Sequence, residues 1–191
     1  CTPLHLAAKN GHLEICRALM RMLVEKNPKD NYGLTPLHAA ASEGQFEICK
    51  VLMENLHDKN PECHIGWTPL HIAADKGLLE IFKLLMKNID DKNPIDNHGI
   101  TPLHRAANNG HLDVFKEIIQ YLNIINPSNN FGWTPLHAAS YFGYLDVCKF
   151  ISERIEDWNP CTNNGKTPIY FANERNHRAI VSVLRLAQIK D

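Results

Sequence analysis

The chain lacks an excess of charge of either sign. Lys and Arg number 20 and Asp and Glu number 21 among 191 residues, which leaves a net charge of −1. This balance gives no electrostatic attraction to a polyanion, so we expect neither nucleic acid nor an anionic membrane surface as the partner. The sequence also lacks any apolar run near the roughly 18 residues that a spanning helix needs, and we expect no membrane insertion.

Signatures of enzymes and cofactor sites are missing as well. The sequence contains no HExxH, GxSxG or SxxK pattern and no Rossmann glycine fingerprint, the patterns that place a metal, a nucleophile or a dinucleotide at fixed spacing. The segment from Gly165 to Thr167 resembles the end of a phosphate-binding loop, but Pro160 stands where that loop needs its first glycine. We therefore expect no catalytic residue, no enzyme activity and no cofactor.

What the sequence has instead is one unit that recurs along the whole chain. Thr-Pro-Leu-His begins at Thr2 and returns every 33 residues, with a degenerate sixth copy at Thr167. Glycines and an Asn-Pro pair recur at the same period. Such a period is typical of stacked repeats in a single domain, here residues 1–191 with a truncated first repeat. The repeats begin near Cys1, Leu34, Trp67, Ile100, Trp133 and Lys166.

The residues of one unit predict two helices and a turn. Thr35 can cap a helix whose first residue, Pro36, needs no N–H partner, and Gly44 can end that helix in a left-handed conformation. Apolar residues spaced by three and four then predict a second helix, which we expect Asn60-Pro61 to stop. Because a lone helix pair cannot bury its apolar face, we expect the pairs to stack.

Thr35-Pro36-Leu37-His38, followed by Ala-Ala and Gly44, resembles the ankyrin repeat, and the resemblance covers the whole chain. It implies an all-α solenoid of helix-turn-helix pairs with projecting β-hairpin-like loops. It also implies a concave face, made of hairpin tips and first helices, that contacts a partner protein. The fourth motif residue is implied to brace one repeat against the next through hydrogen bonds, and it is His5, His38, His71, His104 and His137.

The chain departs from the ankyrin pattern at three places. Aliphatic residues replace the usual glycine after the second helix, so we expect that helix to run longer, with this side chain packed inward: Leu23, Leu56, Ile89, Leu122 and Ile155. The loop aspartate is kept only at Asp30 and Asp96, so the other hairpins should be held less uniformly. The sixth repeat lacks the motif His and Gly and resembles a solvated C-terminal cap. No such cap precedes Thr2, and we expect more sequence upstream.

Cysteine spacing predicts free thiols rather than disulfides. Three of the six cysteines occupy a repeat position that elsewhere holds Phe82 or Phe115, so this position is buried and apolar. We expect an intracellular, reducing compartment, cytoplasmic with a nuclear location left open. His57, Cys63 and His64 lack the fourth ligand of a structural zinc site, and we expect no metal.

The positions that the repeat leaves free are the candidates for partner binding. By the resemblance they flank the loop glycine or precede the helix-ending glycine, and they face the groove. Centred on repeats three to five, the candidates are Tyr32, Leu34, Ile65, Trp67, Asp75, Lys76, His98, Ile100, Asn108, Asn109, Phe131, Trp133, Tyr141 and Phe142. The fifth repeat is aromatic at four of its five free positions, with Tyr144 close by, which predicts an exposed apolar patch. The two Trp residues could equally brace their own hairpins.

These observations predict a monomeric scaffold that binds a protein or peptide. One alternative is a spacer or adaptor segment of a larger protein. Another is a reader of methylated lysine, with Trp133, Tyr141 and Phe142 as the walls of an aromatic cage. The resemblance also admits hydroxylation of the loop Asn, but Lys precedes most of these residues where the family favours Val or Ile, and we favour the helix-stop interpretation.

Overall fold

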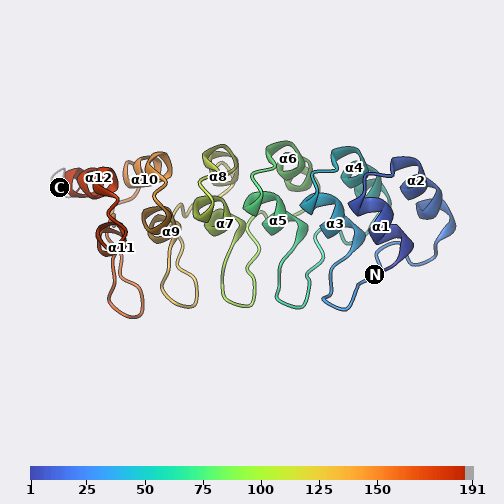
Figure 1. Ribbon diagram of the computed structural model, residues 1–191, viewed down its shortest axis with the longest axis horizontal. Coiled ribbons are helices and arrows are strands. Elements are labelled where there is room, and N and C mark those ends of the chain that lie inside the picture. The colour runs from blue at the N-terminus through green and yellow to red at the C-terminus, as the bar shows by residue number, and fades with distance from the viewer. Residues whose placement is uncertain (188–191) are drawn as a thin grey trace.

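In the computed structural model, which describes residues 1–187, six helix pairs stack in a row with the chain ends at opposite ends (Figure 1). The first helices of the pairs, here called inner helices, are α1 (Pro3–Lys9), α3 (Pro36–Ser42), α5 (Pro69–Asp75), α7 (Pro102–Asn108), α9 (Pro135–Phe142) and α11 (Pro168–Glu174). The second, outer helices are α2 (Leu13–Met22), α4 (Phe46–Asn55), α6 (Leu79–Asn88), α8 (Leu112–Ile119), α10 (Leu145–Ser152) and α12 (Arg178–Ala187).

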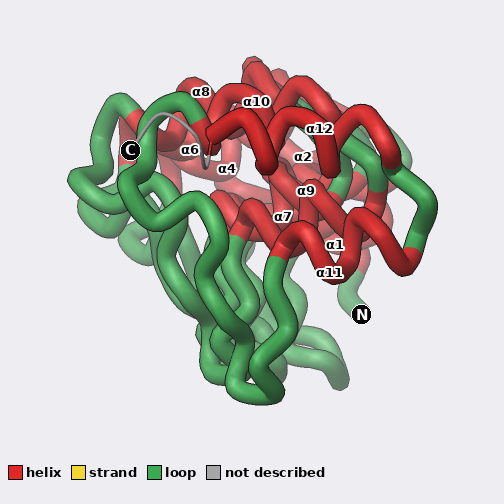
Figure 2. Tube along the Cα trace, turned by 90° about the vertical axis from the view of Figure 1, so that its left-hand side faces the viewer, coloured by secondary structure: helices red, strands yellow, loops and turns green. Residues whose placement is uncertain are grey.

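The hairpins that join one pair to the next all project to the same side of the helical layers (Figure 2). No residue from 1 to 187 is assigned to a strand, and none of the helices in that range is long and apolar enough to cross a membrane. The predicted all-α solenoid with projecting loops is confirmed.

Each inner helix begins as the sequence predicts. The backbone N–H of His71 donates to the Thr68 hydroxyl oxygen, and the N–H of Thr68 donates to His71 Nδ1 at 3.2 Å. These two bonds satisfy donors that a helix start leaves without partners. At the other end of the first helices the chain adopts the left-handed conformation, with φ of 73° at Gly44 and 60° at Asn176. Asn replaces Gly there because its short polar side chain tolerates this conformation.

The motif histidines form a ladder between repeats, as predicted. His38 Nε2 lies 3.0 Å from the carbonyl oxygen of Trp67, and His104 Nε2 lies 3.1 Å from that of Trp133. Since Nδ1 accepts from a Thr N–H, the proton must reside on Nε2, which donates to the carbonyl. Burial lowers the pKa to about 4 for His38, His71, His104 and His137.

The outer helices do not run through the added aliphatic residue, so that prediction is wrong. The α4 helix ends at Asn55, and Leu56 is extended, with φ of −101° and ψ of 140°. The side chain of Leu56 still packs into the core, as does that of Ile89. An extended backbone lets the side chain point inward while the chain already turns back toward the next repeat.

Asn60-Pro61 does not stop the outer helix either, because α4 ends five residues before Asn60. The Asn side chain instead serves the next inner helix. Asn126 Oδ1 accepts from the N–H of Leu136 at 2.9 Å, and Asn60 Oδ1 accepts from that of Leu70 at 3.4 Å. Both are N–H groups in the first turn of a helix, where no intrahelical acceptor exists. At these two of the five Asn-Pro pairs, the asparagine therefore caps the following helix; the side-chain oxygens of Asn27, Asn93 and Asn159 are buried without a hydrogen-bond partner among the described residues.

The hairpins are held by the loop residue, with the unevenness that its substitutions predict. Asp30 Oδ1 accepts from the N–H groups of Tyr32 and Leu34 at 2.8 and 2.9 Å, and Asn129 makes the same two bonds in its hairpin. Thr162 makes one such bond, at 3.1 Å. The side chain of Cys63 makes no such bond, and its hairpin is held by the backbone hydrogen bonds between Cys63 and Trp67 and between Gly66 and Cys63.

A continuous core runs through all six repeats. It contains the three cysteines of the shared position, together with Phe82 and Phe115. All six cysteines are free. The basic residues of the sixth repeat agree with the predicted solvated cap: Arg175, Arg178 and Arg185 are exposed, whereas Lys190 lies outside the described residues.

Candidate partner-binding face

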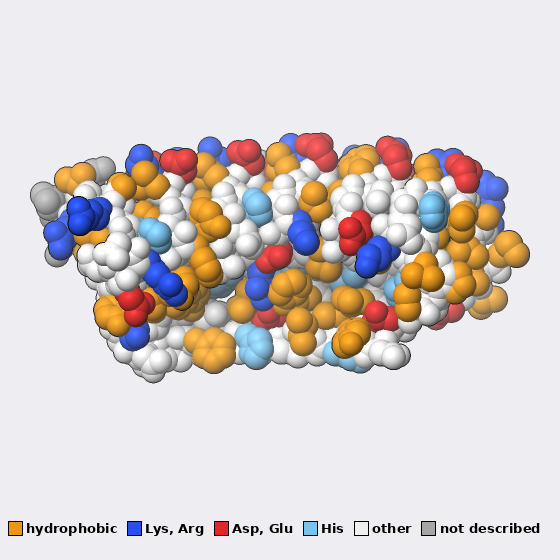
Figure 3. All heavy atoms as spheres, in the orientation of Figure 1, with side chains coloured by type: hydrophobic (Ala, Val, Ile, Leu, Met, Phe, Trp, Pro, Cys, Tyr) orange, Lys and Arg blue, Asp and Glu red, His pale blue; other side chains and the backbone are white. Residues whose placement is uncertain are grey.

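The inner helices and the hairpins meet at an angle (Figure 2), and we call the side of the molecule that they line the inner face. Figure 3 shows this face, with charged side chains concentrated along the outer-helix edge and hydrophobic side chains gathered over the inner helices and hairpins. Two hollows lie in the corner: one of about 270 Å³ in repeats one to three and one of about 50 Å³ in repeats four and five.

Four predicted residues form a row along the hairpin tips. Tyr32, Ile65, His98 and Phe131 are all exposed, with 73% of Tyr32 and 58% of Phe131 accessible. The rings of His98 and Phe131 lie 5.9 Å apart. The row therefore continues through four neighbouring hairpins.

Hydrogen bonds between neighbouring tips hold this row in place. At four junctions, a backbone N–H of one tip donates to a backbone carbonyl oxygen of the preceding tip, at 3.0–3.2 Å. The donor and acceptor residues are His64 and Tyr32, Asn97 and Ile65, Asn130 and His98, and Asn163 and Phe131. The side-chain amides of the same three asparagines donate to the preceding tip at 3.0–3.3 Å. Three of the four junctions therefore have two bonds and the first has one, so the exposed side chains stand on a backbone that is already ordered.

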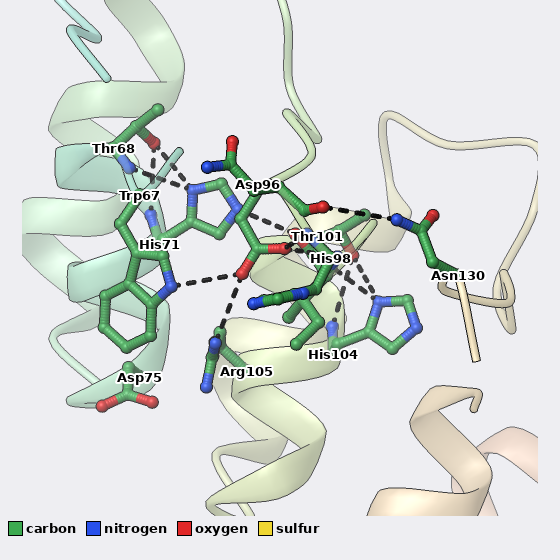
Figure 4. A network of polar contacts seen from close by, with 12 residues as sticks. Trp67, Thr68, His71, Asp75, Asp96, His98, Thr101, His104, Arg105 and Asn130 are labelled. Carbon is green, nitrogen blue, oxygen red and sulfur yellow. Dashed lines mark hydrogen bonds and ion pairs between the residues drawn. The ribbon is translucent and has the colours of Figure 1, made fainter. Parts of the chain in front are cut away.

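Repeats three and four contain a polar network centred on a buried carboxylate (Figure 4). Asp96 Oδ2 accepts from Trp67 Nε1 at 3.2 Å and from Arg105 Nη2 at 3.4 Å. Its Oδ1 accepts from the N–H groups of His98 and Ile100 at 2.8 and 2.9 Å. The Arg105 guanidinium lies 4.1 Å from the Trp67 ring centroid. Trp67 thus braces its neighbouring hairpin, and the charge of Arg105 is matched within the chain.

The predicted residues at the ends of the inner helices divide into engaged and free side chains. Asp75 Oδ1 accepts from Asn109 Nδ2 at 3.0 Å, which links repeats three and four. Lys76 is exposed, whereas Asn108 lines the smaller hollow together with Ile100 and Trp133. Leu34, the remaining predicted residue, lines the larger hollow.

The fifth repeat's aromatic residues form a packed cluster rather than an open patch. The ring centroid of Trp133 lies 4.6 Å from that of Phe171 and 5.9 Å from that of Tyr141. The ring centroids of Tyr141 and Phe142 lie 4.9 Å apart. Trp133 and Tyr141 are half-buried, whereas Phe142 is 47% exposed. The predicted patch is therefore reduced to its two phenylalanines, Phe131 and Phe142. The fifth aromatic residue, Tyr144, is partly buried against the core and packs over the glycine that ends α7.

A cage for methylated lysine would need the ring faces to be free. The guanidinium carbon of Arg175 already lies 4.0 Å from the centroid of Tyr141, and Trp133 contacts Phe171 and stacks with His137 at 5.5 Å. An external ammonium group would have to displace the chain's own side chains.

Several residues of the inner face escaped the sequence prediction because they occupy the motif's fifth position. This position, directly after the motif His, places Arg105 in the polar network and Phe171 in the aromatic cluster. It also contributes Leu6, Ala39 and Ile72 to the larger hollow. The signal was available in the sequence: within an otherwise uniform motif, this position changes from Leu to Ala, Ile, Arg and Phe.

In residues 1–187, no three His, Cys, Asp or Glu side chains lie close enough to hold a metal ion. The four buried histidines with a lowered pKa are engaged in the ladder between repeats. The inner face therefore offers shape, apolar contacts and charge.

Comparison with known proteins agrees with this geometry. Family models described as ankyrin repeats match residues 1–63 and 56–126 (three copies) and residues 103–151 (many copies). Among solved structures, the crystal structure of an ankyrin repeat domain from Acinetobacter baumannii AYE matches with a TM-score of 0.82 and 25% sequence identity, over 97% of each chain. No curated protein sequence matches the chain significantly. The chain belongs to the ankyrin-repeat family.

Proposed function

We propose that the chain is a monomeric scaffold that binds a protein or peptide partner on its inner face, centred on repeats three to five. Ankyrin repeats are generally protein-interaction modules, and the fold is typically a non-catalytic scaffold. Six free cysteines, four of them buried, support a reducing intracellular compartment.

One observation carries the proposal: exposed apolar side chains stand on hairpin tips that are already hydrogen-bonded to one another. Phe131 and Ile65 are more than half exposed, yet their backbone is fixed by the ladder between tips. A surface that is ordered before binding loses little conformational entropy when a partner docks. Exposed aromatic residues also contribute strongly to binding free energy when a partner covers them.

The test compares two double variants that remove similar apolar area. Phe131→Ala/Phe142→Ala alters the inner face, and Tyr121→Ala/Ile124→Ala alters exposed residues just beyond α8, away from the inner helices. Partners captured by the wild-type chain would be identified by mass spectrometry and then bound in purified form. We expect the first variant to lose the purified partner and the second to keep it, while circular dichroism shows both folded.

Equal binding by both variants would reject the inner face as the site. The spacer or adaptor alternative would then gain support, because such a segment works through the sequence around it. The methyl-lysine alternative has no supporting contact, since the ring faces it needs are filled by Arg175 and Phe171.

A further inference from the structure

The C-terminal end of the inner face carries two cations that have no carboxylate partner within residues 1–187. Lys166 Nζ lies 4.7 Å from the ring centroid of Tyr170, and the guanidinium carbon of Arg175 lies 4.0 Å from that of Tyr141. The ion pairs within residues 1–187 involve other side chains, and neither cationic head group makes a hydrogen bond there. Arg105 differs, because it is paired with the buried Asp96.

The contact with Tyr141 leaves the Arg175 guanidinium available to an anion. Its carbon lies over the Tyr141 ring, and a guanidinium carries five N–H donors in one planar fork that matches a carboxylate. Tyr141 is itself fixed by Phe142 at 4.9 Å and Phe171 at 5.8 Å. A guanidinium that is restrained by a neighbouring ring can meet a carboxylate with two parallel hydrogen bonds and loses less side-chain entropy in doing so.

Few acidic side chains compete for these cations. The α9 helix and the two hairpins of residues 127–133 and 160–166 contain one charged residue between them, Lys166. The α11 helix adds Glu174, which precedes Arg175 and is exposed. This end of the inner face therefore contains two positive charges and one negative charge, although the whole chain has a net charge of −1.

We propose that this end of the inner face binds an acidic protein segment in which Asp or Glu neighbours an apolar side chain. The carboxylates pair with Arg175 and Lys166, and the apolar side chain packs against Phe142 and Phe131, which are exposed nearby on the same face. This inference rests on the proposed function and specifies the chemistry of the partner.

The experiment selects peptides from a displayed random library on the wild-type chain and measures the winners by fluorescence anisotropy. We expect enrichment of Asp or Glu beside an apolar residue. The variant Lys166→Gln/Arg175→Gln should bind these peptides about tenfold more weakly or worse. The matched control Arg21→Gln/Lys50→Gln removes the same two residue types from exposed positions of the outer helices α2 and α4 and should bind nearly as well as wild type.

A thermodynamic cycle adds a direct check of the pairing. Replacing the acidic residues of a selected peptide by Asn or Gln should weaken its binding to the wild-type chain about as much as the Lys166→Gln/Arg175→Gln substitutions weaken binding of the unaltered peptide. The same peptide change should have little further effect on binding to Lys166→Gln/Arg175→Gln. Selected peptides without acidic enrichment, equal weakening in the matched control, or a library that yields no binder would each overturn the inference. The proposed function would still stand if peptides of another composition lost binding in Phe131→Ala/Phe142→Ala.

Discussion

Lowering the pH below about 6.5 should weaken the fold, because the histidine ladder requires neutral rings. In the folded chain Nδ1 of His71 accepts the N–H of Thr68, and Nε2 lies 3.0 Å from the carbonyl oxygen of Ile100. A proton added to Nδ1 would face that N–H and remove its acceptor. Burial accordingly lowers the pKa of four ladder histidines to about 4.

The sign and size of the effect follow from the difference between the folded and unfolded pKa. An unfolded His titrates near pH 6.5, so between about pH 6.5 and 4 the unfolded chain binds more protons than the folded chain. The contribution to stability is complete above this range and is lost as the pH falls through it. Each His loses up to about 1.4 kcal/mol per pH unit, so four independent sites lose about 5 kcal/mol between about pH 7.5 and 5.5. This loss is comparable with the whole stability of many domains.

Urea unfolding followed by far-ultraviolet circular dichroism at several pH values measures this dependence. The variant His71→Gln should reduce the slope of unfolding free energy against pH by about one proton. The control His12→Gln/His57→Gln removes two exposed histidines and should leave the slope unchanged. A stability that stays flat from about pH 7.5 to 5.5, or a slope that His71→Gln does not alter, would refute the reasoning.

Three further predictions concern single side chains and can be checked by the same unfolding measurement. Asp96→Ala should lower the free energy of unfolding by about 3–5 kcal/mol, because it removes a buried carboxylate and leaves two partly buried side-chain donors without their acceptor. Asp30→Ala removes the acceptor of two backbone N–H groups and should lower it by about 1–2 kcal/mol; equal costs would contradict this account. Gly110→Ala should lower the free energy of unfolding by about 2–4 kcal/mol, since the new Cβ would lie 2.3 Å from a ring atom of Tyr144. Gly165→Ala has open space around the new Cβ and should lower it by only about 1 kcal/mol, the strain of a left-handed alanine. Cys63→Asn should stabilise the chain by about 1 kcal/mol by supplying the missing acceptor in its hairpin, and no gain would show that the backbone bonds already suffice.

The parts of the fold that sequence predicts well are those set by nearby residues. A Thr-Pro pair such as Thr35-Pro36 starts each inner helix, and a left-handed residue such as Gly44 follows its end. The starts and ends of the inner helices therefore recur with the period of the motif. The histidine ladder was also predicted, because the resemblance of the motif to the ankyrin repeat implies it. These signals lie within a few residues of the structure that they specify.

The end of the outer helix could not be predicted in this way. Leu56 is a good helix former, and nothing next to it requires an extended backbone. Its conformation is set by the core, which accepts the side chain, and by the return of the chain to Thr68. The role of Asn60 depends equally on distance in sequence, because its acceptor faces an N–H ten residues later.

The inner face was predicted only in part because neighbouring repeats decide what each side chain can offer. Trp133 and Tyr141 are free positions of repeat five, yet Phe171 and Arg175 from repeat six cover them. The same dependence acts on charge. Repeats three and four neutralise Arg105 with a buried carboxylate, whereas Arg175 in repeat six lies over a tyrosine ring and forms no ion pair with the residues that the structure describes. A nearly neutral chain can therefore present a local positive site, and the net charge that argues against a polyanion as partner does not argue against one acidic segment at this end of the face.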